Sequence, residues 1–393
     1  MSFDSIIIGA GAAGLYAAMH AGRRGRRVLV IEHNQEPGAK ILISGGGRCN
    51  FTNLNAGDPA RYLSANPHFA RSALARHGPG DFIALVKQHN IAFYEKTLGQ
   101  LFCEGARASH KIVRMLLDEC EAAGVSLRLN CRVLGVTRGE RFVVETSQGV
   151  FESETLCVAT GGLSIPKMGA SGFAFEIAKH FGVSVTPLRP GLVPLTFAET
   201  DLAWMRALAG VSADAMVSAG KQAFREAALF THRGMSGPAI LQISSYLTPP
   251  NQYFSVDWLP DSGADVLIAA KRARPQALPK TALAQHVPER LAAVLAGAHP
   301  PRPLGEWRDE ALSAFAERTL KRAMLKPIGT EGYAKAEVMV GGVDTNALSQ
   351  ATMQCRAAPG LFFVGEAVDV TGWLGGYNFQ WAWSSGWAAG QAL

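Results

Sequence analysis

The sequence lacks the cysteine patterns of a disulfide scaffold or a structural metal site. Its 393 residues contain six cysteines, and none of them forms a C-x-x-C pair. No His-rich tract has metal-ligand spacing either. We therefore expect no disulfide framework, no metal site and no dithiol redox pair adjacent in sequence. A chain of this length buries a large core without such cross-links.

Charge is also sparse, and it is nearly balanced. Charged residues make up 18% of the chain and hydrophobic residues 48%, a composition that excludes a disordered protein. Lys and Arg number 38 against 32 Asp and Glu, which gives a net charge of +6. This excess permits an anionic ligand or an RNA surface but requires neither. Basic clusters at 23–27 and 271–274 are most simply explained as solvated charges of loops and helix ends.

The sequence shows no clear membrane or export signal. Its first residues lack the basic stretch and the cleavage site of a signal peptide. Residues 370–393 carry no charge, but their glycines and their Asn, Gln and Ser side chains make a poor membrane span. We expect a cytoplasmic protein without a membrane partner, and the sequence does not indicate its oligomeric state.

Glycine is what the chain has in excess, and the first glycine turn lies near its start. Residues 9–14 form a G-x-G-x-x-G motif between a predicted strand at 5–8 and a predicted helix at 15–22. A second predicted strand, at 28–31, is followed directly by Glu32. This order of strand, turn, helix, strand and acidic residue is typical of a dinucleotide-binding βαβ unit.

The residue types in this first turn each have a physical role. Gly9 allows the tight turn, Gly11 lets backbone amides approach a pyrophosphate, and Gly14 lets the helix pack close to the strand. The N-terminus of the helix then faces the anion. Glu32 would accept hydrogen bonds from the adenosine ribose and repel the 2′-phosphate of NADP, which favours FAD or NAD. An ordinary glycine-rich turn is the less specific alternative.

A second glycine turn occupies residues 44–50, shortly after Lys40. Its three consecutive glycines cost backbone entropy, so they indicate a loop that lies flat against a ligand. Arg48 and Asn50 offer hydrogen-bond donors that suit the carbonyls and ring nitrogens of an isoalloxazine. The turn is therefore a candidate flavin contact.

A third candidate segment lies near the end of the chain. A predicted buried strand at 361–366 is followed by Asp369, by residues 375–378 and by an apolar helix from Phe379. In single-chain flavoproteins such a strand and helix commonly close over the ribityl chain and the flavin. The helix N-terminus would stabilise negative charge on the reduced ring, and Glu366 or Asp369 could hold a ribityl hydroxyl.

Taken together, these motifs resemble the HI0933-like flavoprotein family (BaiN/YhiN type) from end to end. Besides G-x-G-x-x-G, the resemblance rests on GGGRCN at 45–50, THRGMSGP at 231–238 and the glycine-rich end at 365–382. It implies FAD as the cofactor and an α/β fold, with a Rossmann-like FAD-binding domain of the glutathione-reductase type and an inserted β-rich and helical domain. It also implies that the backbone of Val133 meets the adenine and that residues 160–161 lie by the phosphates or the flavin.

The pattern along the chain suggests where these domains divide, because prolines near residue 190 mark an exit from the first region. We expect the FAD-binding domain over 1–186 and 336–393, a β-rich part over 187–262 to which strands could be added near 327–335, and a small helical subdomain over 263–326. Within the inserted part, residues 234–238 interrupt the predicted strands. Residues 306–326 form the clearest amphipathic helix.

The expected cofactor-binding residues come from the three segments described above and from the family resemblance. They are Gly9, Gly11, Ala13, Gly14, Glu32, Lys40, Gly46, Arg48, Cys49, Asn50, Val133, Thr160, Gly161, Gly365, Glu366, Asp369, Gly376, Tyr377, Asn378 and Phe379.

Two residues are candidates for proton transfer in catalysis. Cys49, in the second glycine turn, could protonate a substrate carbon while the flavin delivers hydride to its neighbour. His232 could supply a proton near neutral pH from the inserted domain. The alternatives are a small side chain that packs under the ring for Cys49 and a structural hinge residue for His232.

The resemblance implies flavin-dependent reduction of a carbon–carbon double bond, in a steroid-like enone or in a uridine of ribosomal RNA. We expect an FAD-dependent oxidoreductase that reduces an activated double bond in a small-molecule or nucleobase substrate, with NADH or NADPH as electron source. An RNA enzyme that reduces uridine and a non-catalytic flavin-binding protein are the alternatives. Because no second G-x-G-x-x-G follows residue 160, we expect the nicotinamide to bind transiently on the substrate side of the flavin.

Overall fold

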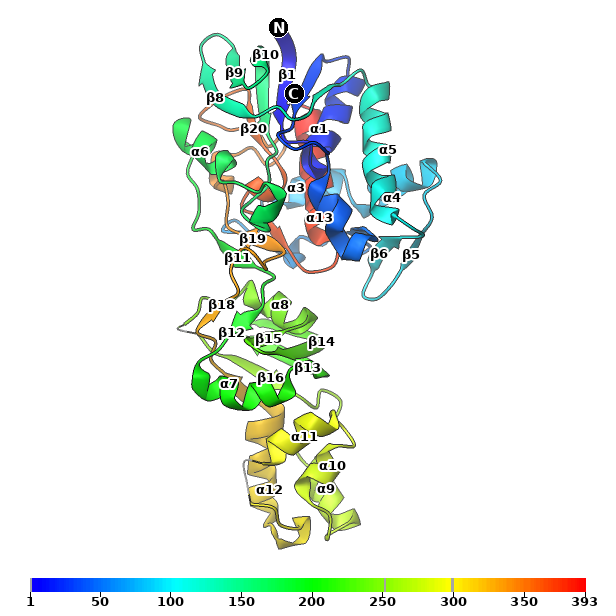
Figure 1. Ribbon diagram of the computed structural model, residues 1–393, viewed down its shortest axis with the longest axis vertical. Coiled ribbons are helices and arrows are strands. Elements are labelled where there is room, and N and C mark those ends of the chain that lie inside the picture. The colour runs from blue at the N-terminus through cyan, green and yellow to red at the C-terminus, as the bar shows by residue number, and fades with distance from the viewer. Residues whose placement is uncertain (1, 251, 298–299) are drawn as a thin grey trace. The chain divides into compact units, whose positions relative to one another are not determined.

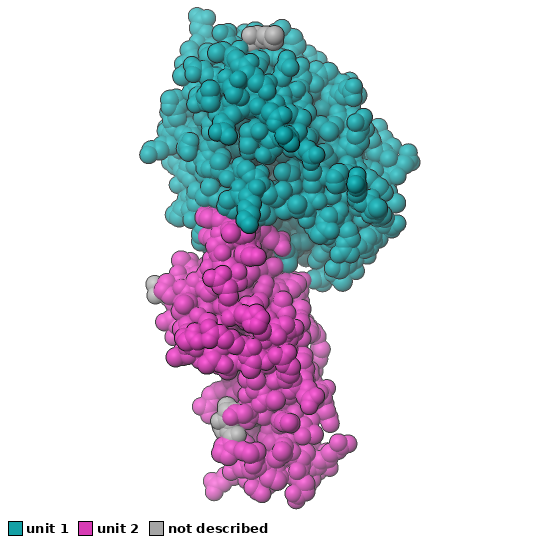
Figure 2. All heavy atoms as spheres, in the orientation of Figure 1, with its two compact units in different colours: residues 1–189, 338–393 teal, residues 190–337 magenta. Residues whose placement is uncertain are grey.

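The computed structural model describes residues 2–250, 252–297 and 300–393. The chain divides into two compact units, which are coloured separately in Figure 2. Unit 1 comprises residues 1–189 and 338–393, and unit 2 comprises residues 190–337. Unit 1 is therefore discontinuous, because the chain leaves it within strand β11 (Arg189–Gly191) and re-enters it at strand β19 (Val338–Val340).

The described residues of unit 1 contain a seven-stranded sheet with parallel strands at its centre. Its order is β7 (Ser126–Arg128), β2 (Val28–Ile31), β1 (Ser2–Ile8), β10 (Gly149–Val158), β9 (Phe142–Thr146) and β8 (Val133–Arg138), and β20 (Leu361–Phe363) also pairs with β10. All four residues of β2 are buried, as expected of a parallel strand that is covered on both faces. The α/β Rossmann-like architecture predicted from the sequence is confirmed.

Helix α1 (Ala12–Arg23) packs on this sheet, and helix α13 (Tyr377–Gly390) lies beside α1 (Figure 1). Their contact depends on glycine, because a Cβ atom added to Gly386 would lie 2.6 Å from the carbonyl oxygen of Ala13. One added to Gly390 would lie 2.8 Å from the carbonyl oxygen of Ala17. The first helix and the last helix of the fold are thus in backbone contact.

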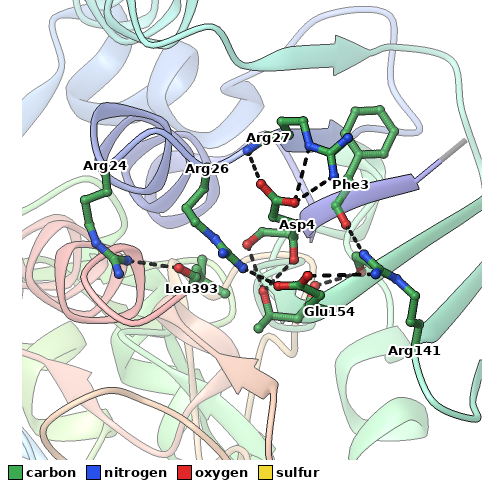
Figure 3. A network of polar contacts seen from close by, with 11 residues as sticks. Phe3, Asp4, Arg24, Arg26, Arg27, Arg141, Glu154 and Leu393 are labelled. Atoms are coloured by element: carbon green, nitrogen blue, oxygen red, sulfur yellow. Dashed lines mark hydrogen bonds and ion pairs between the residues drawn. The ribbon is translucent and has the colours of Figure 1, made fainter.

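The arginines of the 23–27 cluster also connect distant parts of unit 1 (Figure 3). Arg24 donates to the carbonyl oxygens of Gly390 and Leu393 at 3.0 and 2.9 Å. Arg26 forms an ion pair with Glu154 at 2.8 Å, and Arg27 forms one with Asp4 at 2.9 Å. Arg23 pairs with Glu119. All four arginines therefore bind partners within unit 1 and help to hold its segments together.

The remaining elements of unit 1 include two small sheets, of order β3-β6-β5 and β21-β4. They are α2 (Ala39–Ile43), β3 (Asn50–Asn53), β4 (Tyr62–Leu63), α3 (Arg71–Arg76), α4 (Pro79–Gln88), β5 (Phe93–Glu95), β6 (Gln100–Cys103), α5 (Ala108–Ala122), α6 (Phe173–His180) and β21 (Thr371–Gly372).

Unit 2 contains a second seven-stranded sheet in its described residues. The order is β17 (Ala323–Leu325), β16 (Phe254–Asp257), β13 (Ser212–Ala219), β14 (Gln222–Thr231), β15 (Gly234–Ser236), β12 (Leu195–Thr196) and β18 (Gly329–Thr330). Its helices are α7 (Glu199–Met205), α8 (Pro238–Ser244), α9 (Val266–Ala273), α10 (Pro279–Leu283), α11 (Glu289–Ala296) and α12 (Asp309–Phe315). Phe230 and Trp258 stack in its core, with ring centroids 5.5 Å apart.

Two details of unit 2 differ from the sequence-based expectation. The amphipathic helix predicted over 306–326 is α12 followed by a π-helical segment (Ala316–Lys321), and the chain then enters β17. Pairing of β17 with β16 overrides the helical periodicity there. Residues 234–236, predicted to interrupt the strands, form β15 between β14 and β12.

No helix within the described ranges is both long and apolar enough to cross a membrane.

A histidine cluster, buried at His77 and half-buried at His20, lies between α1, α3 and α13. The hydroxyl of Tyr16 and Nε2 of His77 are 2.7 Å apart, and the His77 ring stacks on Trp387 with centroids 5.4 Å apart. The His20 ring packs against Tyr16 at 4.7 Å. Burial lowers the pKa of His20 to about 3 and that of His77 to about 4, so both rings are neutral in the folded protein.

This cluster predicts acid destabilisation of unit 1. Both depressed pKa values lie below the ordinary value of 6.5, so the stabilisation is complete above pH 6.5 and is lost as the pH falls toward 4. Between pH 6.5 and 5 we expect a loss of about 2 kcal/mol for each histidine. Melting temperatures measured across this range should fall steeply, and the double variant His20→Gln/His77→Gln should flatten the decline. Replacing the exposed His68 by Gln is the matched control and should leave it unchanged.

Candidate functional site

The first glycine turn joins three strands at one edge of the unit 1 sheet. Gly9 has φ +107° and donates its amide to Ile31 at 2.8 Å. A Cβ atom at Gly9 would lie 2.6 Å from the carbonyl oxygen of Ala159, and one at Gly14 would overlap the Gly9 carbonyl oxygen. The turn is thus held so tightly between β1, β2 and β10 that only glycine fits at these two positions.

Gly11 differs from Gly9 and Gly14, because a Cβ atom there would meet no described atom within 4 Å. Gly11 is the N-cap of α1, and no side chain in the described structure caps the amides of the first turn. Ala13, in that turn, is buried beside Gly365, whose added Cβ atom would lie 2.9 Å from Cβ of Ala13. Space and unpaired amides therefore coincide at the N-terminus of a twelve-residue helix, as an anion site requires.

The carboxylate of Glu32 lies beside this turn. It accepts hydrogen bonds from the amides of Ala10 and Asn34, each at 2.9 Å, and it is buried. These bonds fix its position while leaving lone pairs for further donors such as ribose hydroxyls. The amide of Cys131, two residues before Val133, donates to the backbone carbonyl oxygen of Glu32 at 2.9 Å, so the segment that leads into β8 is tied to the backbone at Glu32.

Thr160 follows β10 at the same edge of the sheet. Its Oγ1 atom is buried, and it has no hydrogen-bond partner among the described residues. A Cβ atom at Gly9 would lie 3.2 Å from the Thr160 Cα, so the threonine borders the first glycine turn. Leaving a buried hydroxyl unpaired costs about 1–3 kcal/mol, which indicates that a bound molecule completes the site.

A charged network connects three segments next to Thr160. Lys40 of α2 forms an ion pair with Glu366 and donates to Oγ of Ser164 at 2.6 Å. Ser164 in turn donates to Oε1 of Glu366 at 2.7 Å, and the amide of Met339 donates to the same oxygen at 3.0 Å. Gly161 lies close by, since an added Cβ atom would be 4.0 Å from Oε2 of Glu366. Lys40, Gly161 and Glu366 are thus brought together, and Ser164 was not foreseen.

The sequence predicts that a flat ligand lies against the second glycine turn. The backbone of this turn is accessible at Gly46. Gly45, Gly46 and Gly47 all have positive φ, from +56° to +83°, and a Cβ atom at Gly46 would meet nothing within 4 Å of the described structure. Gly45 packs on Phe102, whose ring would lie 2.6 Å from a Cβ atom there. The exposed Arg48 guanidinium lies 5.6 Å from the centroid of the same ring. A ligand can therefore approach the backbone of this loop without meeting side chains.

Cys49 occupies the interior side of the loop, with φ +51° and no exposed surface. Its thiol lies against Cys103 on β6, and a hydrogen bond to Cys103, followed by burial, raises the pKa of Cys49 well above its ordinary value. The two cysteines meet because Asn50 pairs with Phe102 across β3 and β6. Their separation in sequence gave no sign of this contact. A buried thiol with a raised pKa is a poor proton donor, which favours the packing role for Cys49.

Asn50 connects the second glycine turn to the segment near the end of the chain. Its amide oxygen accepts a hydrogen bond from the Gly376 amide at 3.2 Å, and its nitrogen donates to the carbonyl oxygens of Thr52 and Leu101. Gly376 has φ +98°, and a Cβ atom there would overlap the Thr52 carbonyl oxygen. Opposite ends of the polypeptide thus form one wall of the site.

The other residues predicted near the end of the chain have structural contacts of their own. Asn378 accepts a bond from the Gly372 amide at 2.8 Å, and the Tyr377 hydroxyl accepts one from Arg61 at 2.8 Å. Asp369 accepts a bond from the Ala65 amide at 2.9 Å, and burial raises the pKa of its carboxyl. The half-buried Phe379 stacks on Trp383 within α13, with centroids 5.8 Å apart.

His232 lies elsewhere in the chain from the residues described so far. It occupies the turn between β14 and β15 of unit 2, and its side chain is exposed. The structure therefore groups the predicted cofactor residues within unit 1, whereas the two candidate proton donors belong to different units.

Comparison with known proteins gives a consistent result over the whole chain. Residues 3–392 match the family described as "HI0933-like protein Rossmann domain". A "Ribosomal RNA dihydrouridine synthase" of Escherichia coli is 50% identical over 100% of this chain and 98% of its own length. The protein of the same name in Haemophilus influenzae is 44% identical over 99% of this chain and 98% of its own length.

More distant similarities also extend along the chain. The "3-dehydro-bile acid delta(4,6)-reductase" of Clostridium scindens is 30% identical over 98% of this chain and 98% of its own length. Among solved structures, Mycobacterium smegmatis Sdh1 in complex with UQ1 aligns with a TM-score of 0.50 and 17% identity, over 100% of this chain and 68% of that one. This last likeness shows the fold alone.

The unpaired Thr160 hydroxyl generates a prediction about ligand binding. Thr160→Val removes the hydroxyl at nearly constant volume, so we expect the ligand-free protein to melt at a higher temperature while its affinity for FAD falls by up to about tenfold. Fluorescence titration with FAD and thermal unfolding of the stripped protein measure the two effects.

Thr345 provides the matched control for this substitution. Its Oγ1 atom is also buried without a partner in the described chain, but Thr345 is not among the residues predicted to contact the cofactor. Thr345→Val should stabilise the stripped protein in the same way and leave the FAD affinity unchanged. Equal FAD affinity in the Thr160→Val and wild-type proteins would mean that Thr160 does not contact the cofactor.

Proposed function

The chain belongs to the HI0933-like family of flavoproteins, and from this membership we propose that it is an FAD-dependent reductase of uridine in ribosomal RNA. The observation that carries the proposal is the 50% identity to the Escherichia coli ribosomal RNA dihydrouridine synthase along the whole of both chains. The second relative of that name, in Haemophilus influenzae, supports the same substrate. The general class, a flavoprotein oxidoreductase, follows from the family.

The residues of unit 1 fit FAD. The free amides at the start of α1 suit the pyrophosphate, and the fixed Glu32 carboxylate suits the adenosine ribose. The start of β8, at Val133, would meet the adenine. Thr160, whose hydroxyl has no partner among the described residues, and the open Gly46 region offer a hydroxyl and bare backbone to the remainder of the cofactor.

When bound, FAD supplies hydride chemistry, accepting two electrons from NADH or NADPH and passing them to a carbon–carbon double bond. The overall reaction adds one hydride and one proton across the double bond of the uracil ring and oxidises one nicotinamide. The chain itself must then bind the base, exclude water and provide the proton. We propose transient nicotinamide binding on the substrate side, since the sequence offers no second dinucleotide motif.

The Clostridium scindens relative gives a second candidate substrate class. Its name describes reduction of double bonds in a bile acid, and its 30% identity also extends along the whole chain. A steroid-like enone and a uracil ring present the same reactive unit, a double bond conjugated to a carbonyl group. The two candidates therefore share the reaction and differ in the recognition of the substrate.

Incubation of the FAD-loaded protein with an unmodified ribosomal RNA transcript and either nicotinamide tests the proposal directly. We expect nucleoside mass spectrometry to detect uridine that has gained two hydrogens, in an amount that matches the nicotinamide oxidised. A 3-keto-Δ4 steroid serves as the competing substrate. Reduction of the steroid without any change in the RNA would reject uridine as the substrate and support a steroid-like enone instead. Failure of both nicotinamides to reduce the flavin would instead favour a non-catalytic flavin-binding protein.

Variants of Cys49 and His232 test which of the two residues donates the proton. Because Cys49 is buried, we propose His232 as the donor. We expect Cys49→Ser to retain the wild-type rate of double-bond reduction. We expect His232→Asn to lower that rate by about 10²-fold or more, which is the usual loss when a general acid is removed. In both variants, anaerobic reduction of the flavin by nicotinamide should proceed at the wild-type rate. A slow Cys49→Ser variant that still binds FAD would reassign the proton to the thiol.

A further inference from the structure

The positive charge of this protein is concentrated in one short part of the sequence. Residues 263–326 contain eleven Lys and Arg against six Asp and Glu, a net charge of +5. The other 329 residues contain 27 against 26, a net charge of +1. Nearly the whole excess of the chain therefore lies in the part of unit 2 that carries helices α9 to α12 and ends just after β17, which we call the helical subdomain (residues 263–326).

The two basic clusters found in the sequence differ in how many of their side chains have partners in the structure. In the 23–27 cluster, Arg26 and Arg27 are ion-paired and Arg24 binds carbonyl oxygens (Figure 3), and Arg23 pairs with Glu119. In the 271–274 cluster, Lys271 pairs with Asp309 at 2.7 Å. Arg272 and Arg274 are exposed, and neither forms an ion pair within the described ranges, although the charge of Arg272 also acts on Asp309.

The end of α9 and the beginning of α12 bring further arginines beside these two. The backbone joins the two segments, since the amide of Gly305 donates to Pro275 at 2.7 Å and that of Leu304 donates to Ala277 at 2.8 Å. Lys271 strengthens the junction by also donating to the Trp307 carbonyl oxygen at 2.7 Å. We call the four exposed arginines at this junction the arginine cluster: Arg272, Arg274, Arg302 and Arg308.

The arginine cluster retains its charge on the surface. Arg302 lies 4.1 Å above the centroid of the Trp307 ring, which holds its guanidinium without neutralising it. Of the acidic side chains at the same junction, Asp309 is occupied by Lys271, which lowers the pKa of that carboxyl. Glu306 and Glu310 are exposed as well, and neither forms an ion pair in the described structure, so this junction carries four arginines against two carboxylates outside ion pairs.

We propose that the arginine cluster of the helical subdomain binds the phosphate backbone of the RNA substrate. The inference rests on the proposed function, which supplies a polyanionic substrate far larger than a single uracil ring. Exposed arginines that form no ion pair in the described structure, on a locally basic surface, match the chemistry of phosphate contacts, which position RNA without reading its sequence. The cluster is a positioning surface, separate in sequence from every residue assigned to the cofactor.

The salt dependence of RNA binding tests this assignment in the full-length, FAD-loaded protein. The probe is an unmodified ribosomal RNA transcript, titrated by filter binding at several KCl concentrations. In Arg272→Gln/Arg274→Gln we expect affinity to fall by about tenfold, and the slope of log affinity against log salt to shrink by about 1.4. The Michaelis constant for RNA should rise while kcat and flavin reduction by nicotinamide stay unchanged.

A control variant with the same loss of charge separates a local surface from overall charge. Arg71 and Lys87 are exposed residues of unit 1, and Arg71→Gln/Lys87→Gln removes the same two positive charges. It should keep the wild-type affinity and slope. A second variant, Arg302→Gln/Arg308→Gln, should repeat the loss seen for the first pair. Equal RNA affinity in all four proteins would overturn the assignment, as would an equal loss in the control.

The outcomes for the surface and for the proposed function can be distinguished. Dihydrouridine formation by wild type, together with unaltered RNA binding by both arginine variants, would overturn the surface and leave the function standing. Arginine-dependent RNA binding without dihydrouridine formation would support the surface and reject the function. Co-sedimentation with phosphatidylglycerol vesicles is the competing measurement. Vesicle binding that needs the arginine cluster, in a protein without affinity for RNA, would assign the surface to membranes and overturn the proposal.

Discussion

The candidate site depends on the close approach of backbone to backbone at glycine positions. Gly9 and Gly14 let the first turn close against β10, and Gly386 and Gly390 let α13 pack directly on α1. Since α13 begins immediately after Gly376, the packing of these two helices also determines where the Gly376 amide meets Asn50. The wall built from both ends of the chain therefore depends on these glycines, which have no side chain to keep the backbones apart.

Polar side chains line the space that the glycines leave in the candidate site. The carboxylates of Glu32, Glu366 and Asp369 are each held by backbone amides, so their positions are set before any ligand arrives. Lys40 and Ser164 compensate the charge of Glu366 within the same network. By contrast, the hydroxyl of Thr160 is buried and unpaired in the described structure. A site with fixed acceptors and an unused polar group is preorganised for a ligand that supplies the missing partner.

The sequence predicted most reliably the features that local pattern controls. The apolar run 28–31 is strand β2, and the G-x-G-x-x-G motif directly follows β1 and opens α1, which begins at Ala12 rather than at the predicted residue 15. Prediction failed where a distant strand competed with local periodicity, as at Ala323–Leu325, which pair with β16. The contact of Cys49 with Cys103 and the place of Ser164 beside Lys40 also depend on the alignment of separate segments. No spacing in the sequence encodes those two contacts.

The division of unit 1 between the two ends of the polypeptide has a consequence for biosynthesis. Strand β20 and helix α13 leave the ribosome after all of unit 2, so a nascent chain carries the first glycine turn long before its counterpart at Gly376 exists. Until then the face of α1 that α13 covers, which includes Ala13 and Ala17, has no neighbour to bury it. Incorporation of a flavin would accordingly be a late event in the maturation of this protein, and shortened translation products would be left with an unprotected apolar helix.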